Sequence, residues 1–227
     1  IENAKETAKE TEILYENPDA DCTWLSYSKK RKVLTAISYY TWKPERVFLD
    51  EFIEKIYNTI KSQLGNYEVS IVDTDDDESK FIIRSYSDRS LGSYYLYDSI
   101  TGKLEKIADD SPWLNEDEMA ETKPVYYTSR DGLKIQGYLT LPLNKQPQNL
   151  PLVLNVHGGP WARDQWGFNP EVQFLANRGY AVLQVNFRGS TGFGRKFWEA
   201  SFKQWGKTMQ DDLTDGVNWL IEKGIAD

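Results

Sequence analysis

The sequence predicts an α/β fold in which a parallel sheet with flanking helices follows a region of antiparallel β-sheet that contains one helical insertion. Three observations support this prediction. Short strand-like runs separated by charged turns fill roughly the first 110 residues. From Thr128 onward, strand patterns alternate with helix patterns, which is the order of elements in a parallel sheet. Aromatic residues make up 14% of the chain, and such residues favour half-buried strands.

Charge and cysteine content exclude several classes of partner and site. The chain has 27 Lys and Arg residues against 35 Asp and Glu residues, and it has no long basic run that could follow a phosphate backbone. Nucleic acid is therefore not an expected partner. The single cysteine, Cys22, excludes an intramolecular disulfide bond and a cysteine-based zinc site. We expect neither a metal nor a cofactor.

Hydropathy gives no sign of a membrane span, because no run of about 18 apolar residues is present. The first residues, Ile1 to Glu6, lack the apolar stretch of a signal peptide. They also lack an initiator Met, so we expect that a longer chain or a processed precursor supplied this segment. We expect a soluble protein, and the sequence leaves open whether it resides in the cytoplasm, the periplasm or outside the cell.

The first part of the chain, residues 1–115, is predicted to be the end of a β-propeller domain. Four short strands between Tyr67 and Ile107 would form one blade, and the remaining pattern indicates about one partial blade. The clearest strand-like runs are Val33–Tyr40, Tyr67–Val72, Phe81–Tyr86 and Tyr94–Tyr97.

An alternating acidic run, Asp73, Asp75 and Asp77, invites comparison with a calcium-binding loop. Such a loop needs Gly and Glu where this chain has Glu78 and Arg84. We therefore predict a solvated turn between two strands.

One helix interrupts the strands, near residues 48–64. Apolar residues recur every four positions from Phe48 to Leu64, and Gly65 follows as a stop signal. This apolar stripe is typical of a packing surface rather than of a ligand site.

A domain boundary is predicted near residues 111–125. This stretch is charged and flanked by Pro112 and Pro124, as linkers between folding units often are. The second unit, residues 116–227, then begins with a strand pattern from Ile135 to Leu141.

The strongest sequence signal follows the apolar run Leu152–Val156, which is typical of a strand buried on both faces of a parallel sheet. His157, Gly158, Gly159 and Pro160 come directly after it, at the strand end where ligands of open α/β sheets bind. Two adjacent glycines allow backbone N–H groups to point into a cleft, as an oxyanion hole requires. The alternative interpretation is a plain turn.

The rest of the chain continues this strand and helix order. With the strand Leu152–Val156, a helix through 174–178 and a buried strand over 180–185 form a βαβ unit, and the loop 186–194 follows it. The glycines of that loop lack the lysine and the spacing of nucleotide-binding loops. In the last predicted helix, over 209–221, Asp211 and Asp212 lie in the first turn. Acids at this position usually interact with the helix dipole, so we predict that role for them rather than a catalytic one.

The order of these motifs resembles the hydrolase domain of the prolyl oligopeptidase family, and it is similar to the branch of acylaminoacyl and dipeptidyl peptidases. The resemblance is strongest over residues 125–227 and looser before them. It rests on His157-Gly-Gly-Pro160, Arg163-Asp164, Asn186-Phe-Arg-Gly-Ser-Thr-Gly-Phe-Gly194, Gln210-Asp-Asp-Leu213 and Gly224-Ile-Ala-Asp227.

The resemblance implies an incomplete α/β-hydrolase of a serine peptidase that cleaves short peptides through a Ser, Asp, His triad, with a propeller restricting access. No serine of this chain has Gly at both the second position before and the second position after it. We therefore expect a fragment that ends before the nucleophile and is inactive alone. Two alternatives stay open: a non-catalytic interaction protein built on these domains, and an esterase on the same fold.

Six residues are candidates for the site. Gly159, with Gly158 and His157, is predicted to form the oxyanion hole and the wall of the active site. His157 precedes the expected serine and so cannot be the triad base; it either supports the oxyanion or structures the loop. Arg163, Asp164 and Arg188 are predicted to line the substrate cleft or to structure its loops. The expected partner is a peptide, and an unpaired sheet edge would favour self-association.

Overall fold

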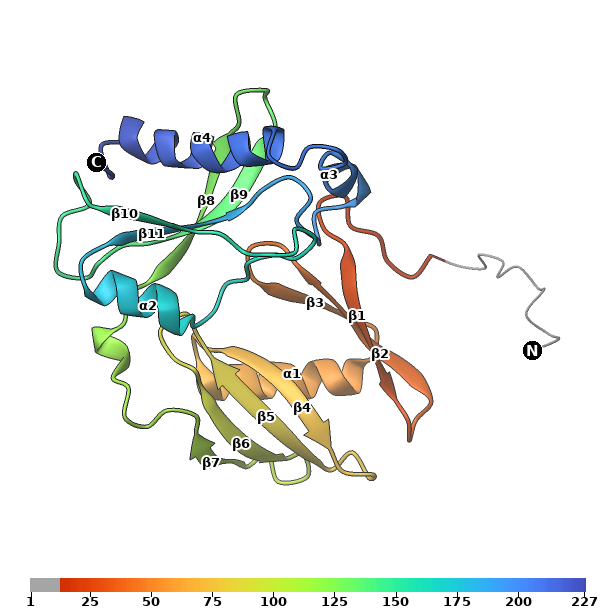
Figure 1. Cartoon of the computed structure of the whole chain (residues 1–227). Helices are drawn as coiled ribbons and strands as arrows, with labels where there is room; N and C mark the ends of the chain where they lie inside the picture. Colours follow the sequence, from red (N-terminus) through yellow and green to blue (C-terminus); the bar gives the residue numbers. More distant parts are fainter. Residues whose placement is uncertain (1–12) are drawn as a thin grey trace.

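The computed structural model describes residues 13–227, so the expectation about a signal peptide at Ile1 to Glu6 lies outside it. Three sheets make up the fold (Figure 1). A three-stranded sheet, β1-β2-β3, and a four-stranded sheet, β4-β5-β6-β7, form the first part of the chain. A second four-stranded sheet, in the order β10-β11-β9-β8, carries helices on both faces (Figure 1).

The first sheet contains the strands β1 (Cys22–Ser28), β2 (Val33–Tyr40) and β3 (Pro44–Phe48), all antiparallel. Strand β2 has the predicted bounds. Strands β1 and β3 were not predicted. Strand β1 is exposed along most of its length and shows no alternation of buried residues. Strand β3 begins with a proline, which an edge strand tolerates because its outer N–H groups need no partner.

Helix α1 (Glu51–Leu64) confirms the predicted helix but begins later than expected. The Asp50 side chain caps it by accepting a hydrogen bond from the Ile53 N–H. Phe48, predicted to lie in the helix, belongs to β3 instead. Ile56 and Ile60 are buried against the second sheet, where they share a core with strands β4, β5 and β6.

The second sheet is an antiparallel meander of β4 (Glu68–Thr74), β5 (Lys80–Tyr86), β6 (Ser93–Asp98) and β7 (Leu104–Asp109). In the turn between β4 and β5, the Asp75 carboxylate accepts hydrogen bonds from two backbone N–H groups, as expected for a solvated turn. The four strands lie where the sequence predicted them. That this sheet is a propeller blade stays a prediction.

The predicted linker is partly ordered structure. It contains the short helix η1 (Glu116–Glu118) and the start of strand β8 (Thr122–Thr128). The prediction that the linker extends to residue 125 is therefore wrong, because its last residues belong to a strand. Pro124 lies within β8, which is an edge strand and so tolerates a proline.

The third sheet is mixed rather than parallel. Strands β10 (Leu152–Asn155) and β11 (Ala181–Asn186) are parallel neighbours joined through α2 (Pro170–Asn177), as predicted. Strand β9 (Lys134–Thr140), however, pairs antiparallel with both β11 and β8. Strand β11 is fully buried, whereas β10 is only half-buried because it lies at the edge of the described sheet. The prediction that β10 is buried on both faces is therefore wrong.

Two further helices follow β11, namely α3 (Arg195–Glu199) and α4 (Thr208–Glu222). Helix α4 covers one face of the third sheet and α2 the other (Figure 1). Met209, Leu213 and Leu220 of α4 are buried in a core with β9 and β11, but Ile221, predicted on the same face, is 47% exposed. No helix within residues 13–227 is long and apolar enough to cross a membrane.

Candidate functional site

The loop after β10 carries the three residues that were predicted to form an oxyanion hole. Gly159 has φ of 127°, and a Cβ atom there would lie 2.8 Å from the Trp161 nitrogen, so this position requires glycine. Gly158 has no positive φ and a Cβ there would contact nothing within 4 Å, so its backbone conformation does not require glycine. Among residues 13–227, no acceptor receives a hydrogen bond from the Gly159 N–H.

His157 is held against the next loop of the site. Its ring stacks on Phe187 with ring centroids 4.6 Å apart. Its Nε2 atom lies 3.0 Å from the Ser190 hydroxyl, and its Nδ1 atom lies 2.9 Å from the Gly158 carbonyl oxygen. These contacts occupy both ring nitrogens, which favours the loop-structuring alternative for His157.

Asp164 fixes the far end of this loop to strand β11. Its N–H donates to Asn186 Oδ1 at 2.8 Å, and Asn186 Nδ2 donates back to the Asp164 carbonyl at 3.1 Å. Asn186 is fully buried, and its Nδ2 also donates to Gln136 on β9. Burial raises the pKa of the Asp164 carboxyl, although the charge of His157 and a hydrogen bond from Gln184 oppose this shift.

Arg163 lies where this loop meets the first sheet. Its Nη2 donates to the Thr41 carbonyl, in the turn between β2 and β3, at 3.0 Å. Its guanidinium also lies over the ring of Phe193 at 4.4 Å and over that of Tyr40 at 5.6 Å. Burial lowers the pKa of Arg163, and Tyr138 opposes that shift.

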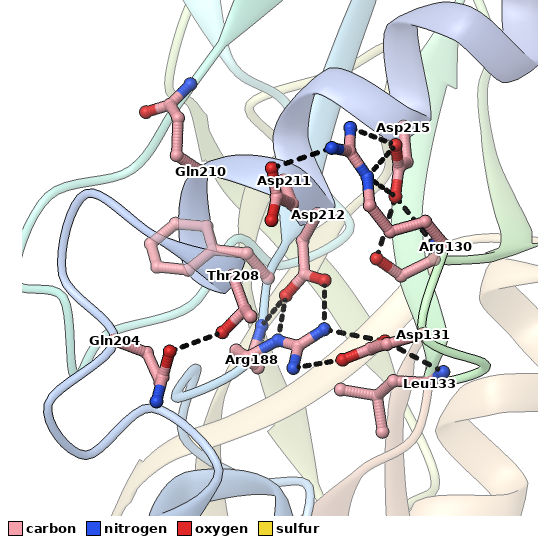
Figure 2. Close-up of polar contacts among 12 residues, drawn as sticks. Arg130, Asp131, Leu133, Arg188, Gln204, Thr208, Gln210, Asp211, Asp212 and Asp215 are labelled. Atoms are coloured by element: carbon pink, nitrogen blue, oxygen red, sulfur yellow. Dashed lines mark hydrogen bonds and ion pairs between the residues drawn. The ribbon is translucent and has the colours of Figure 1, made fainter.

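Arg188, in contrast, contacts buried acidic residues. Its buried guanidinium donates to both carboxylate oxygens of Asp212 at 2.7 and 2.8 Å, and to Asp131 at 2.7 and 2.9 Å (Figure 2). The hydrogen bonds that Arg188 donates to Asp212 raise the pKa of Arg188. Asp212 is fully buried and accepts hydrogen bonds from Arg188, so the prediction that it serves the helix dipole is wrong. These contacts favour the loop-structuring alternative for Arg188, and they give no support to a role in the substrate cleft.

A second ion pair on α4 lies beside the first. Arg130 donates to Asp215 through its backbone N–H and its guanidinium, and it also pairs with Asp211 at 3.0 Å (Figure 2). Ser129 Oγ donates to the same Asp215 carboxylate at 2.9 Å. These hydrogen bonds, that from Arg130 foremost, lower the pKa of Asp215 from 3.8 to about 2.

His157, Gly158, Gly159, Arg163 and Asp164 therefore lie on one loop, whereas the Arg188 guanidinium contacts Asp131 and Asp212. Sequence reasoning missed Asn186, Gln184 and Ser190, which hold this loop by hydrogen bonds. A signal for them existed, since polar residues inside a fully buried strand need partners. Ser190 is fully buried and donates to the Phe187 carbonyl, so it is not an accessible nucleophile.

Comparison with known proteins assigns the family. Residues 166–227 match the Prolyl oligopeptidase family. The chain is 43% identical over 171 residues to dipeptidyl aminopeptidase BIII of Pseudoxanthomonas mexicana, covering 72% of this chain and 25% of that protein. It is 32% identical over 242 residues to dipeptidyl peptidase family member 6 of Caenorhabditis elegans, covering 97% of this chain and 33% of that protein.

A solved structure supports the same fold over most of the chain. The acylaminoacyl peptidase of Pyrococcus horikoshii superposes with a TM-score of 0.63 at 21% identity, covering 92% of this chain and 32% of that one. The chain thus spans about a quarter to a third of the length of the relatives it matches. By motif order, by sequence similarity and by fold, the chain belongs to the prolyl oligopeptidase family.

Proposed function

We propose that this chain is part of a serine peptidase that hydrolyses short peptides through an acyl-enzyme, and that the Gly159 N–H is one of two oxyanion donors. The observation that carries the proposal is the Gly159 amide, which follows a strand of the sheet and is not paired with any acceptor in residues 13–227. The names of the two relatives, both dipeptidyl peptidases, favour short peptides as substrates.

The chemistry that such an amide supplies is electrostatic. When a nucleophile attacks a peptide carbonyl, the carbonyl oxygen becomes negative, and an N–H placed beforehand stabilises that charge. One donor of this kind contributes about 2.7–4 kcal/mol to the transition state. An N–H already bonded to a protein acceptor could not do so, which is why the free state of the Gly159 amide supports the proposal.

The remaining residues of the loop keep this amide in place. Asn186 holds the loop through both backbone groups of Asp164, and His157 holds its start through Ser190. Holding a donor in a fixed direction before the reaction avoids the cost of reorienting it during the reaction. The cleft expected beside Gly159 is part of this proposal.

We further propose that residues 1–227 have no peptidase activity alone, because no serine of this sequence lies in a Gly-x-Ser-x-Gly motif. A fluorophosphonate probe, which reacts with activated serines, tests this directly. We expect no stoichiometric label on the isolated chain. A label on Ser190 or on any other serine of the chain would contradict the proposal.

The coding sequence beyond Asp227 tests the function itself. We expect a Gly-x-Ser-x-Gly motif within about two dozen residues, followed by an Asp and then a His. A stop codon directly after Asp227 would overturn the peptidase proposal and favour an interaction protein. With the complete protein, turnover of aminoacyl amides would indicate a peptidase, whereas turnover of short acyl esters alone would indicate an esterase.

A further inference from the structure

We infer that Arg163 is a positioning residue that couples the turn between β2 and β3 to the loop that carries Gly159. The inference rests on the proposed function, since it assigns to the first sheet a part in holding the oxyanion donor. We call residues 41–43 the hairpin turn and residues 157–166 the oxyanion loop. Arg163 joins the two directly, through the hydrogen bond from its Nη2 to the Thr41 carbonyl.

The hairpin turn is held at every one of its residues. Arg163 binds the Thr41 carbonyl at 3.0 Å, and the Tyr138 hydroxyl of β9 binds the Trp42 carbonyl at 2.8 Å. The Lys43 ammonium lies 3.8 Å from the ring centroid of Trp166, the last residue of the oxyanion loop. Two of the three contacts therefore come from the oxyanion loop, which makes the turn a support for that loop.

On its other side, Arg163 contacts the loop after β11. Its guanidinium lies over Phe193, and a Cβ atom at Gly192 would come within 2.5 Å of Nη1. Nη1 has no hydrogen-bond acceptor among the described residues, so this side of the guanidinium is held by packing alone. Thr191 adds a hydrogen bond from its N–H to the Ala162 carbonyl at 2.9 Å.

The contacts of Arg163 suit a guanidinium better than an ammonium. A planar guanidinium can stack on an aromatic ring while it donates in its own plane, whereas an ammonium is a compact point charge that needs hydration. Tyr40 and Phe193 lie along the guanidinium while Nη2 reaches Thr41. A lysine at this position would keep a charge and one donor but would lose the stacked contacts.

Loss of these contacts would free the middle of the oxyanion loop. The loop would keep its hydrogen bonds at His157, Ala162 and Asp164, but Gly159 lies in the stretch between the first two of these residues. A misplacement of about 1 Å at a catalytic group can lower the rate about 100-fold. We therefore expect Arg163 to affect kcat rather than substrate binding.

The test uses the complete protein with three variants at the junction. We expect Arg163→Met to lower kcat at least tenfold with KM changed less than twofold, and Arg163→Lys to recover part of the loss. Lys43→Met, on the opposite side of the junction, should lower kcat in the same direction. Because both changes loosen the same contact, the double variant should lose less than the product of the two single effects.

A matched control and a second measurement complete the test. Arg178→Met removes another arginine that stacks on an aromatic ring, Phe174 at 3.5 Å. Arg178 is the C-cap residue of α2 and makes none of the contacts of the junction, so we expect unchanged kinetics. Hydrogen exchange in Arg163→Met should become faster in both the hairpin turn and the oxyanion loop, and stay unchanged in α1.

The outcomes separate the two proposals. Wild-type kcat in Arg163→Met, or faster exchange in the oxyanion loop without any change in the hairpin turn, would overturn the coupling. A wild-type protein that neither turns over peptides nor reacts with a fluorophosphonate would overturn the proposed function instead. In that case the exchange measurement would still decide whether Arg163 couples the two segments.

Discussion

The guanidinium of Arg188 and the carboxylate of Asp212 form a buried bidentate ion pair, which joins the loop after β11 to helix α4. Both groups are nearly inaccessible to solvent, with side chains 7% and 0% exposed. The Arg188 N–H donates to the same carboxylate, so one acid holds both the side chain and the backbone of the arginine. The pair therefore fixes the direction in which this loop leaves the sheet.

Asp212→Asn should strongly destabilise the fold, because it leaves the buried Arg188 charge compensated only by the partly exposed Asp131. Removing one partner of a buried ion pair costs about 3–5 kcal/mol. We expect a loss of that size in the free energy of unfolding, measured by urea titration of the chain. Asp77→Asn is the control, since Asp77 also pairs with a cation, Lys30, but its side chain is 84% exposed. Equal losses for the two variants would contradict the buried pair.

The Asp215 carboxylate should give stability that depends on pH in the acid range. Its pKa in the folded state is about 2, below the ordinary value of 3.8, so its contribution is complete above about pH 4 and is lost as the pH falls toward 2. We expect Asp215→Asn to lower the free energy of unfolding by about 1–2 kcal/mol at pH 7. This value is smaller than that for a buried ion pair, because Arg130 is exposed to solvent and water weakens the interaction. Urea titrations at a series of pH values measure this difference.

The difference between wild type and Asp215→Asn should shrink between pH 4 and pH 2. The exposed acid Asp76, in the turn between β4 and β5, provides the control variant Asp76→Asn, for which we expect little effect at any pH. A difference for Asp215→Asn that stays constant down to pH 2 would show that the carboxylate is not held by Arg130.

Gly159→Ala should turn the proposed oxyanion donor away. A side chain there would clash with the Trp161 nitrogen at 2.8 Å and would need φ of 127°, so the backbone must shift. In the complete enzyme we expect kcat to fall about 100-fold or more, with little change in the unfolding temperature. Gly65→Ala, at a positive φ in the C-cap of α1 where no atom lies within 4 Å, should leave kcat unchanged. Normal turnover in Gly159→Ala would mean that the loop is only a turn.

The edge of the third sheet should make the isolated chain self-associate. Strand β10 has a partner on one side only within the described sheet, and an unpaired edge can pair with another chain. We expect the sedimentation coefficient to rise with concentration. Val156→Lys places a charge directly after β10 at a position that is 42% exposed, and it should weaken the association without unfolding the chain. Sedimentation independent of concentration in the wild type would contradict this prediction.

Elements with a strong local pattern could be predicted from the sequence, and elements defined by distant partners could not. Helix α1 follows from its four-residue repeat and Gly65, and the parallel pairing of β10 with β11 follows from the βαβ order. Strand β1 was missed because its exposed residues carry no burial pattern. The mixed character of the third sheet was missed because strand direction depends on the whole topology.

The candidate site divides in the same way. The motif that contains Gly159 is local, and it indicated where a free amide would lie. Asp212 was misinterpreted because an acid early in a helix usually serves the dipole, and its true partner, Arg188, is 24 residues away. The role that we propose for Arg163 depends on Thr41, which no sequence pattern connects to it.

The hydrogen bond between Thr41 and Arg163 spans 122 residues of chain, and that between Trp42 and Tyr138 spans 96. The chain loses more conformational entropy when it closes contacts so distant in sequence than when it pairs neighbouring strands, as in the meander β4 to β7. The hairpins and the βαβ unit should therefore form first in folding, and the junction around Arg163 should close late. The oxyanion loop would then reach its final shape only after the first sheet and the third sheet have both folded. It would therefore be among the first segments to lose that shape if the contact between these two sheets were lost.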